Sequence, residues 1–176
     1  QTEAVALKAS VSTQHRTMCP AVPVQIRMSG SSEVIVTYMG MDNFATASYM
    51  DASLAKLLKL ASSPTNISMT TMDKKNCLVP VQVIHNMEIA SLDGKTVYTI
   101  PKLYAKHNWP FSLADSPSPK DINIFPNLQN IPFNFQKCTI GLLVGINVPE
   151  LLKPLEIIDT HRCGPYASRH LFGWAL

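Results

Sequence analysis

The chain has 176 residues, of which 46% are hydrophobic and only 15% are charged, and its formal net charge is +3. This length favours one domain with a substantial core. Its lysines and arginines are dispersed, which argues against nucleic-acid binding, because that function needs a basic stripe or a clearly basic domain. No apolar run reaches 18 residues and the start lacks the pattern of a signal peptide, so we expect a soluble, intracellular domain with no membrane partner.

The first half of the chain predicts a β-hairpin followed by a short helix. Residues 22–38 alternate between apolar and polar positions on either side of a small-residue turn at 29–32. Asp42 follows this hairpin. Asp51 then precedes apolar residues at helical spacing up to position 60, which is typical of a helix capped by an acidic side chain and ended at 62–64.

Two further hairpins are predicted in the middle of the chain. The first joins residues 67–71 to 78–89 through a polar tip, and the second turns at Asp93 and Gly94, a pair that strongly favours a tight turn. Residues 107–136 are rich in Pro, Asn and Ser with scattered aromatics. A stretch this long without periodicity is usually functional or covers a surface, and we expect its aromatics to cover the sheet.

The last third predicts a strand buried on both faces, a brief helix and a terminal strand. Residues 140–145 are fully apolar, and Pro149 suits the first turn of a helix over 148–152. A turn near 164–166 then leads to a terminal strand. Together these elements predict a mainly β protein with two short helices.

Several segments, in this order, carry a resemblance to a known family. Residues 37–50 comprise an apolar strand, the acidic turn at Asp42, small polar residues and an apolar exit strand, and 53–58 continue into the helix. Further matching segments are Ile-Pro-Lys-Leu-Tyr at 100–104, Phe-Pro-Asn-Leu at 125–128, Gly-Leu-Leu-Val-Gly-Ile-Asn-Val-Pro-Glu at 141–150, and the stretch from Gly-Pro-Tyr at 164–166 to Gly-Trp at 173–174. Together they resemble the peptidase domain of Pao/BEL-type retrotransposons, a branch of the retropepsin-like aspartic peptidases.

The resemblance implies an N-terminal extension at 1–22 and a peptidase domain at 23–176, folded as the closed β-barrel of the acid proteases. It implies a homodimer in which Asp42, once from each chain, activates water against an extended polypeptide, with no cofactor. The flap over the substrate would be the first of the two middle hairpins, with its tip at Met72, Asp73, Lys74, Lys75 and Asn76. Such a domain belongs to a polyprotein, in the cytoplasm or a virus-like particle.

The chain departs from the family at the turn after Asp42. Asn43 and Phe44 stand where the family has Ser or Thr and then Gly, and Asn147 stands where an acid is frequent. We expect Phe44 to fill the substrate channel or to push the two turns apart, because a position chosen for Gly tolerates a Cβ poorly. Two hypotheses follow: an active endopeptidase, or an inactive domain kept for dimerisation or peptide binding.

Other candidate sites are weaker. His85 and His107 have no partner at metal-ligand spacing, so we interpret both as structural and expect no metal site. The sequence 161–163, His-Arg-Cys, places positive charge beside a thiol, but a cysteine nucleophile also needs a base positioned in space. The four cysteines form no CxxC pair, and we expect reduced thiols at Cys19, Cys77, Cys138 and Cys163.

Overall fold

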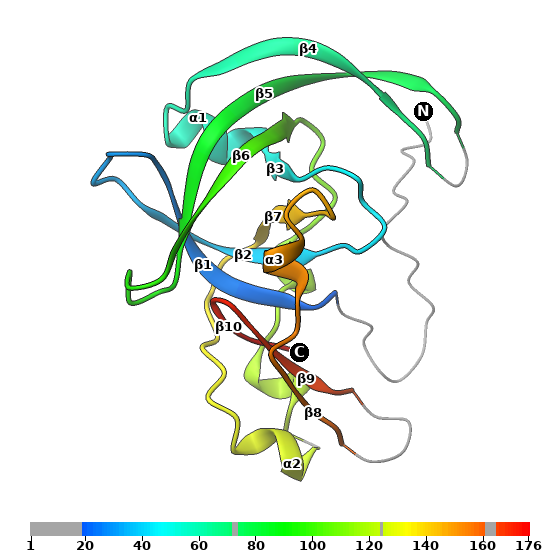
Figure 1. The fold of residues 1–176 in the computed structure, drawn as a ribbon. Coiled ribbons are helices and arrows are strands. Elements are labelled where there is room, and N and C mark those ends of the chain that lie inside the picture. The colour runs from blue at the N-terminus through cyan, green and yellow to red at the C-terminus, as the bar shows by residue number, and fades with distance from the viewer. Residues whose placement is uncertain (1–18, 72–73, 124, 161–164) are drawn as a thin grey trace.

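The structure is a computed structural model, and it describes residues 19–71, 74–123, 125–160 and 165–176. Its larger sheet has the strand order β1-β2-β7-β3-β6-β5-β4, and β1 also pairs with β5, so that six strands close into a mixed β-barrel (Figure 1). The predicted mainly β class and closed barrel are therefore confirmed. The strands are β1 (Ala21–Met28), β2 (Ile35–Met41), β3 (Tyr49–Asp51), β4 (Ser62–Met69), β5 (Cys77–Ala90), β6 (Val97–Lys106) and β7 (Ile140–Val144).

The first predicted hairpin is confirmed as β1 and β2. The two strands pair antiparallel from Ala21 opposite Gly40 to Ile26 opposite Ile35. Alternate residues of β1 are fully buried, which is the pattern of a strand with one face on a core. Asp42 directly follows β2, so this hairpin fixes where its backbone leaves the barrel wall.

The predicted helix is confirmed as α1 (Ala52–Leu57), and its start is where the sequence placed it. The side chain of Asp51 accepts a hydrogen bond from the Ser53 N–H at 2.9 Å. The predicted start of the next strand is wrong by five residues, because β4 begins at Ser62 and includes Pro64. An edge strand tolerates a proline, since its outer side needs no N–H donor.

Strand β4 and the first half of β5 form a long antiparallel ribbon, from Ser62 opposite Ile84 to Met69 opposite Cys77. We call the described residues 62–71 and 74–84 the ribbon. It arches over one end of the barrel (Figure 1). The rest of β5 pairs with β1 and β6, and the predicted turn between β5 and β6 is confirmed, with Gly94 at φ +72°.

The predicted buried strand is β7, all five of whose residues are buried. The predicted helix after it is α3 (Pro149–Leu152), with Pro at its first turn. Both predictions are confirmed. Strand β7 lies between β2, to which it runs parallel, and β3, to which it runs antiparallel, so it has a hydrogen-bonded neighbour on each side.

Two parts of the fold contain more elements than the sequence predicted. The segment 107–136 contains the helix α2 (Pro126–Gln129) and two single-turn 3₁₀ helices, η1 (Leu113–Asp115) and η2 (Pro119–Asp121), and its aromatics pack on two small apolar clusters, as expected. The predicted terminal strand is confirmed as β10 (Gly173–Ala175), but it belongs to an unpredicted three-stranded sheet of order β10-β9-β8, together with β8 (Glu156–Ile158) and β9 (Ala167–His170). Elements of three or four residues are too short for a periodic signal.

Within the described ranges, no helix has the length and apolar character needed to cross a bilayer.

Candidate functional site

Asp42 lies where two parallel strands end side by side. Strand β2 pairs parallel with β7 from Tyr38 opposite Ile140 to Met41 opposite Val144, although the two segments are about a hundred residues apart in sequence. The Asp42 N–H continues the ladder by donating to the Val144 carbonyl at 3.0 Å. The carboxyl ends of both strands therefore fix the backbone of Asp42.

The carboxyl group of Asp42 is buried, with 8% of the residue exposed. Its Oδ1 accepts a hydrogen bond from the Phe44 N–H at 2.9 Å, and its main-chain carbonyl accepts one from the Ala45 N–H at 3.2 Å. Its Oδ2 is buried and has no hydrogen-bond partner among the described residues. A buried carboxyl oxygen left unpaired is costly, so it calls for a functional explanation.

The turn that follows Asp42 is held against the end of β7 by close backbone contact. The Ile146 N–H donates to the Ala45 carbonyl at 2.9 Å. A Cβ placed on Gly145 would lie 2.4 Å from the Ala45 oxygen and 2.5 Å from the Ala47 oxygen, closer than atoms can approach. Only glycine fits at position 145, because the obstructing atoms belong to the backbone.

A buried hydroxyl ties this turn to the segment after β7. The Gly145 N–H donates to Ser48 Oγ at 3.2 Å, and that hydroxyl donates to Asn147 Oδ1 at 2.9 Å. The amide nitrogen of Asn147 in turn donates to the Lys102 carbonyl at 3.5 Å. In the sequence, Asn147 was noted only because the family that the chain resembles often has an acidic residue at this position. An amide both accepts and donates, which an ionised carboxylate cannot do, so Asn147 suits this network.

Asn43 and Phe44, the two residues that follow Asp42, both lie on the surface. Phe44 is 96% exposed, and Asn43 is also exposed. In the single chain the phenyl group therefore projects into solvent directly beside the buried Asp42 carboxyl. The expectation that it fills a substrate channel or separates two turns concerns a second chain, and it stays a prediction.

An aromatic pair lies on the outer side of the barrel next to this turn. Tyr49 of β3 and Tyr104 of β6 are register partners, and their ring centroids are 5.9 Å apart. The ammonium of Lys102 lies 5.2 Å from the centre of the Tyr104 ring. Burial raises the pKa of Tyr49, and the acidic groups of Tyr104 and Asp42 raise it further. The Tyr49 phenol therefore stays protonated at neutral pH.

Only part of the predicted flap tip lies within the residues that the structure describes. Met72 and Asp73 lie outside the described residues, whereas Lys74, Lys75 and Asn76 are described and exposed. The tip is closed by backbone and side-chain hydrogen bonds, from the Thr71 N–H to the Lys74 carbonyl at 2.7 Å and from the Asn76 N–H to Thr70 Oγ1 at 3.2 Å. The described part forms the end of a hairpin, as predicted.

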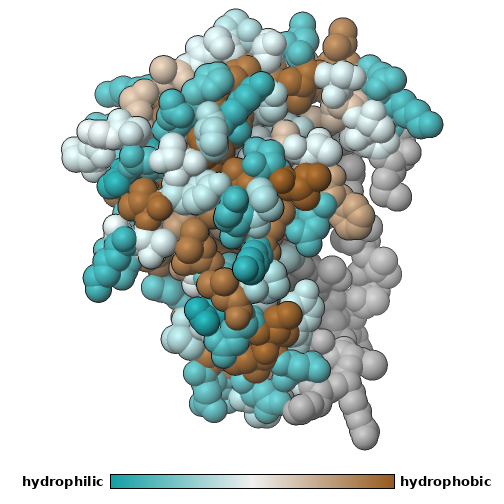
Figure 2. Space-filling view, in the orientation of Figure 1, coloured by the Kyte–Doolittle hydropathy of each residue, from teal (hydrophilic) through white to brown (hydrophobic). Residues whose placement is uncertain are grey.

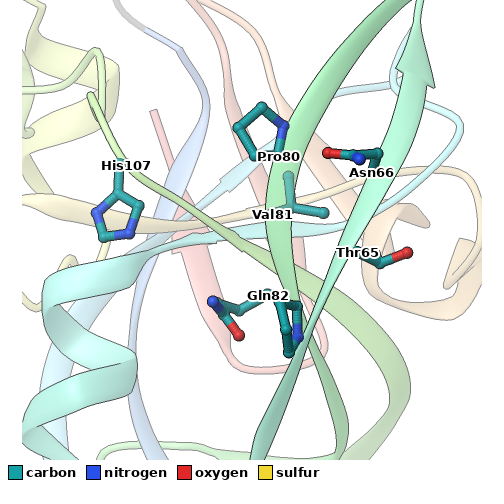
Figure 3. Close-up of a pocket in the computed structure, with 7 residues that line it drawn as sticks. Thr65, Asn66, Pro80, Val81, Gln82 and His107 are labelled. Atoms are coloured by element: carbon teal, nitrogen blue, oxygen red, sulfur yellow. The ribbon is translucent and has the colours of Figure 1, made fainter.

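The ribbon also borders a pocket of about 370 Å³ (Figure 3). His107 faces it from the segment after β6, while the remaining lining residues come from the two ribbon strands: Pro64, Thr65, Asn66, Pro80, Val81 and Gln82. Neither Asp42 nor any other residue of its turn lines this pocket. It therefore belongs to the base of the ribbon and not to the carboxyl site.

The other predicted constellations do not converge on Asp42. His85 is exposed on β5, opposite Lys102 of β6. Residues 161–163 lie outside the described residues. Within the described part of the chain, no three His, Cys, Asp or Glu side chains gather as a metal ion would need.

Comparison with models of known protein families gave no match for this chain, and comparison with curated protein sequences gave no significant match. The site must therefore be interpreted from its own geometry.

Proposed function

We propose that this chain is a retropepsin-like aspartic endopeptidase domain of the Pao/BEL retrotransposon type, which cleaves extended polypeptides when two copies associate. The observation that carries the proposal is the Asp42 carboxyl, fixed at the joined ends of β2 and β7 with Oδ2 buried and unpaired among the described residues. A rigid carboxyl with one free oxygen is suited to bind and activate a water molecule.

Each chain supplies one such carboxyl, so the proposed site needs a two-fold axis that brings two copies of Asp42 together. Two adjacent carboxylates cannot both ionise at low cost, and they therefore share one proton, as in aspartic peptidases generally. The ionised carboxyl then takes a proton from the attacking water. The protonated one donates a hydrogen bond to the peptide carbonyl and polarises it.

Exposed apolar side chains support association with a second copy. Leu155, Ile157, Tyr166 and Leu171 are exposed in or beside the small sheet of β8 to β10. Figure 2 shows apolar side chains gathered over the lower part of this face, where that sheet lies in Figure 1. A contiguous apolar surface on a folded domain indicates a protein interface.

The ribbon supports the peptidase proposal as a cover for the substrate. It is a hairpin whose β4 side is the exposed edge of the larger sheet, and its described tip residues Lys74, Lys75 and Asn76 are exposed. Closure of such a hairpin over a peptide that binds as an extended strand excludes water from the reacting groups.

A second candidate function is an inactive domain that dimerises or binds peptides, and Phe44 is the observation that favours it. Its phenyl group, 96% exposed beside Asp42, projects into the space that two facing turns would share. A displacement of the reacting groups by about 1 Å costs on the order of 100-fold in rate.

The decisive experiment measures cleavage of a fluorogenic extended apolar peptide between acidic and neutral pH, together with the mass in solution by sedimentation. We expect a dimer that cuts, and we expect Asp42→Asn to reduce cutting to background while the dimer persists. Asp93→Asn is the matched control, because Asp93 is an exposed carboxylate in a turn that asparagine also suits. A monomer at all concentrations, or cutting that survives Asp42→Asn, contradicts the proposal.

The double variant Asn43→Ser with Phe44→Gly separates the two candidate functions. If wild type binds the peptide and dimerises without cutting, and the double variant cuts, then the turn has silenced a peptidase. If neither cuts, the inactive domain is the better description.

A further inference from the structure

A row of three side chains on the outer side of the barrel runs from the Asp42 turn to the exposed ammonium of Lys102. Tyr49 and Tyr104 stand opposite each other on β3 and β6, and Lys102 lies over the Tyr104 ring at 5.2 Å from its centre. The neighbouring residues of these strands, such as Met50 and Leu103, are fully buried. Side chains alternate along a strand, so the row faces away from the barrel interior.

The row begins close to Asp42. Tyr49 directly follows Ser48, whose hydroxyl bonds the Asp42 turn to the segment after β7, and the Ser48 carbonyl accepts a hydrogen bond from the Tyr104 N–H at 3.0 Å. The strands that carry the row are therefore bonded to the turn that fixes the catalytic carboxyl. The backbone bond between Ser48 and Tyr104 thus joins the row to the segment that follows Asp42.

The far end of the row carries positive charge. Lys102 is exposed, and no carboxylate among the described residues forms an ion pair with it. Its backbone is fixed by the hydrogen bond from Asn147 and its ammonium lies beside the Tyr104 ring, which limits where the charge can move.

We propose that Tyr49, Tyr104 and Lys102 form a subsite that selects an acidic side chain in the peptide bound across Asp42. The two rings cover the aliphatic part of a glutamate side chain, and the ammonium of Lys102 pairs with its carboxylate. This proposal rests on the proposed function, because the peptide must lie along the carboxyl site. It adds the charge class of the residue that the site prefers.

The test uses the full chain carrying Asp42→Asn, so that peptides bind without being cut. Otherwise identical extended peptides carry Glu, Gln or Lys at each position in turn, and their affinity is measured by fluorescence anisotropy. At one position we expect Glu to bind about two- to fivefold tighter than Gln, the range of an exposed ion pair. Adding Lys102→Glu should make Lys the preferred residue at that position. Lys120→Glu is the control, because Lys120 is also exposed and lies in η2, outside the row.

The outcomes separate this proposal from the peptidase proposal. Equal affinity for Glu, Gln and Lys at every position, or a Glu preference that survives Lys102→Glu, overturns the subsite even if the wild type cuts. A Glu preference that Lys102→Glu reverses supports the subsite even if the wild type never cuts, in which case the endopeptidase alone is refuted. Absence of any peptide binding overturns both.

Discussion

The turn that carries Asp42 and the ribbon that arches over the barrel are built in opposite ways. Residues 42–48 are held by backbone contact with the end of β7 and by the buried Ser48 hydroxyl. The outer half of the ribbon pairs only with itself, and most of the residues of β4 are exposed. A reacting carboxyl must be positioned within a fraction of an ångström, whereas a substrate cover must be free to move. We therefore expect substitutions in the turn to lower the free energy of unfolding more than substitutions in the ribbon.

The largest effect that this comparison predicts comes from Gly145→Ala. The added methyl would meet the Ala45 and Ala47 carbonyl oxygens at 2.4 and 2.5 Å, and backbone atoms cannot give way as side chains do. We expect a loss of about 3 kcal/mol in the free energy of unfolding, measured by chemical denaturation. Where cutting is measurable, we also expect a rate loss on the order of 100-fold, because the turn must move.

Gly40→Ala is the matched control for that variant. Its Cβ would lie 3.1 and 3.2 Å from side-chain methyls of Ile140 and Leu143, which can shift. We expect a loss of less than about 1.5 kcal/mol. Equal losses at the two glycines would refute the view that backbone contact at Gly145 fixes the turn.

An intermediate effect is expected for Ser48→Ala. The change removes the hydroxyl that bonds to Asn147 and leaves the Gly145 N–H buried without its acceptor. We expect about 2 kcal/mol of destabilisation in the same denaturation experiment, since an unpaired buried donor keeps its desolvation cost. Ser62→Ala, at an exposed position of the ribbon, should change stability by less than about 0.5 kcal/mol. A similar cost at both serines would remove the contrast between turn and ribbon.

The smallest effect is expected on the outer part of the ribbon. Leu78 is 73% exposed, so Leu78→Ser should change the free energy of unfolding by less than about 0.5 kcal/mol. Val81, three residues along the same strand, is 4% exposed, and Val81→Ser should cost about 2 kcal/mol by leaving a cavity and burying a hydroxyl. If Leu78→Ser proves as costly as Val81→Ser, the ribbon is packed along its length and is not the mobile cover we propose.

The parts of the fold that the sequence predicts are those with a strong local signal. The hairpin of β1 and β2, the Asp51 cap of α1, the Asp93–Gly94 turn and the apolar strand β7 all follow from patterns within a few residues. The start of β4 was missed because Ser62, Ser63 and Pro64 have no strand preference of their own, and their place in β4 is set by pairing with β5.

The candidate site could be predicted only in part, for the same reason. Asp42 was singled out by the resemblance of residues 37–50 to a peptidase family, but its partners on β7 lie about a hundred residues away and no local pattern indicates them. The Ser48 and Asn147 pair has no sequence signal, since neither residue type is unusual in a turn. A conflict with the turn of the family that the sequence resembles stays a prediction for the Phe44 phenyl group. Its exposure required the structure.

The parallel pairing of β2 with β7 has a consequence for how the protein folds. Contacts between residues 38–41 and 140–144 close a loop that contains most of the barrel, so the carboxyl site cannot form until nearly the whole domain has been assembled. Topologies dominated by such distant contacts fold in milliseconds to seconds, far more slowly than helical bundles. Residues 140–144 must therefore have been made and have paired with β2 before the Asp42 N–H acquires its hydrogen bond to the Val144 carbonyl.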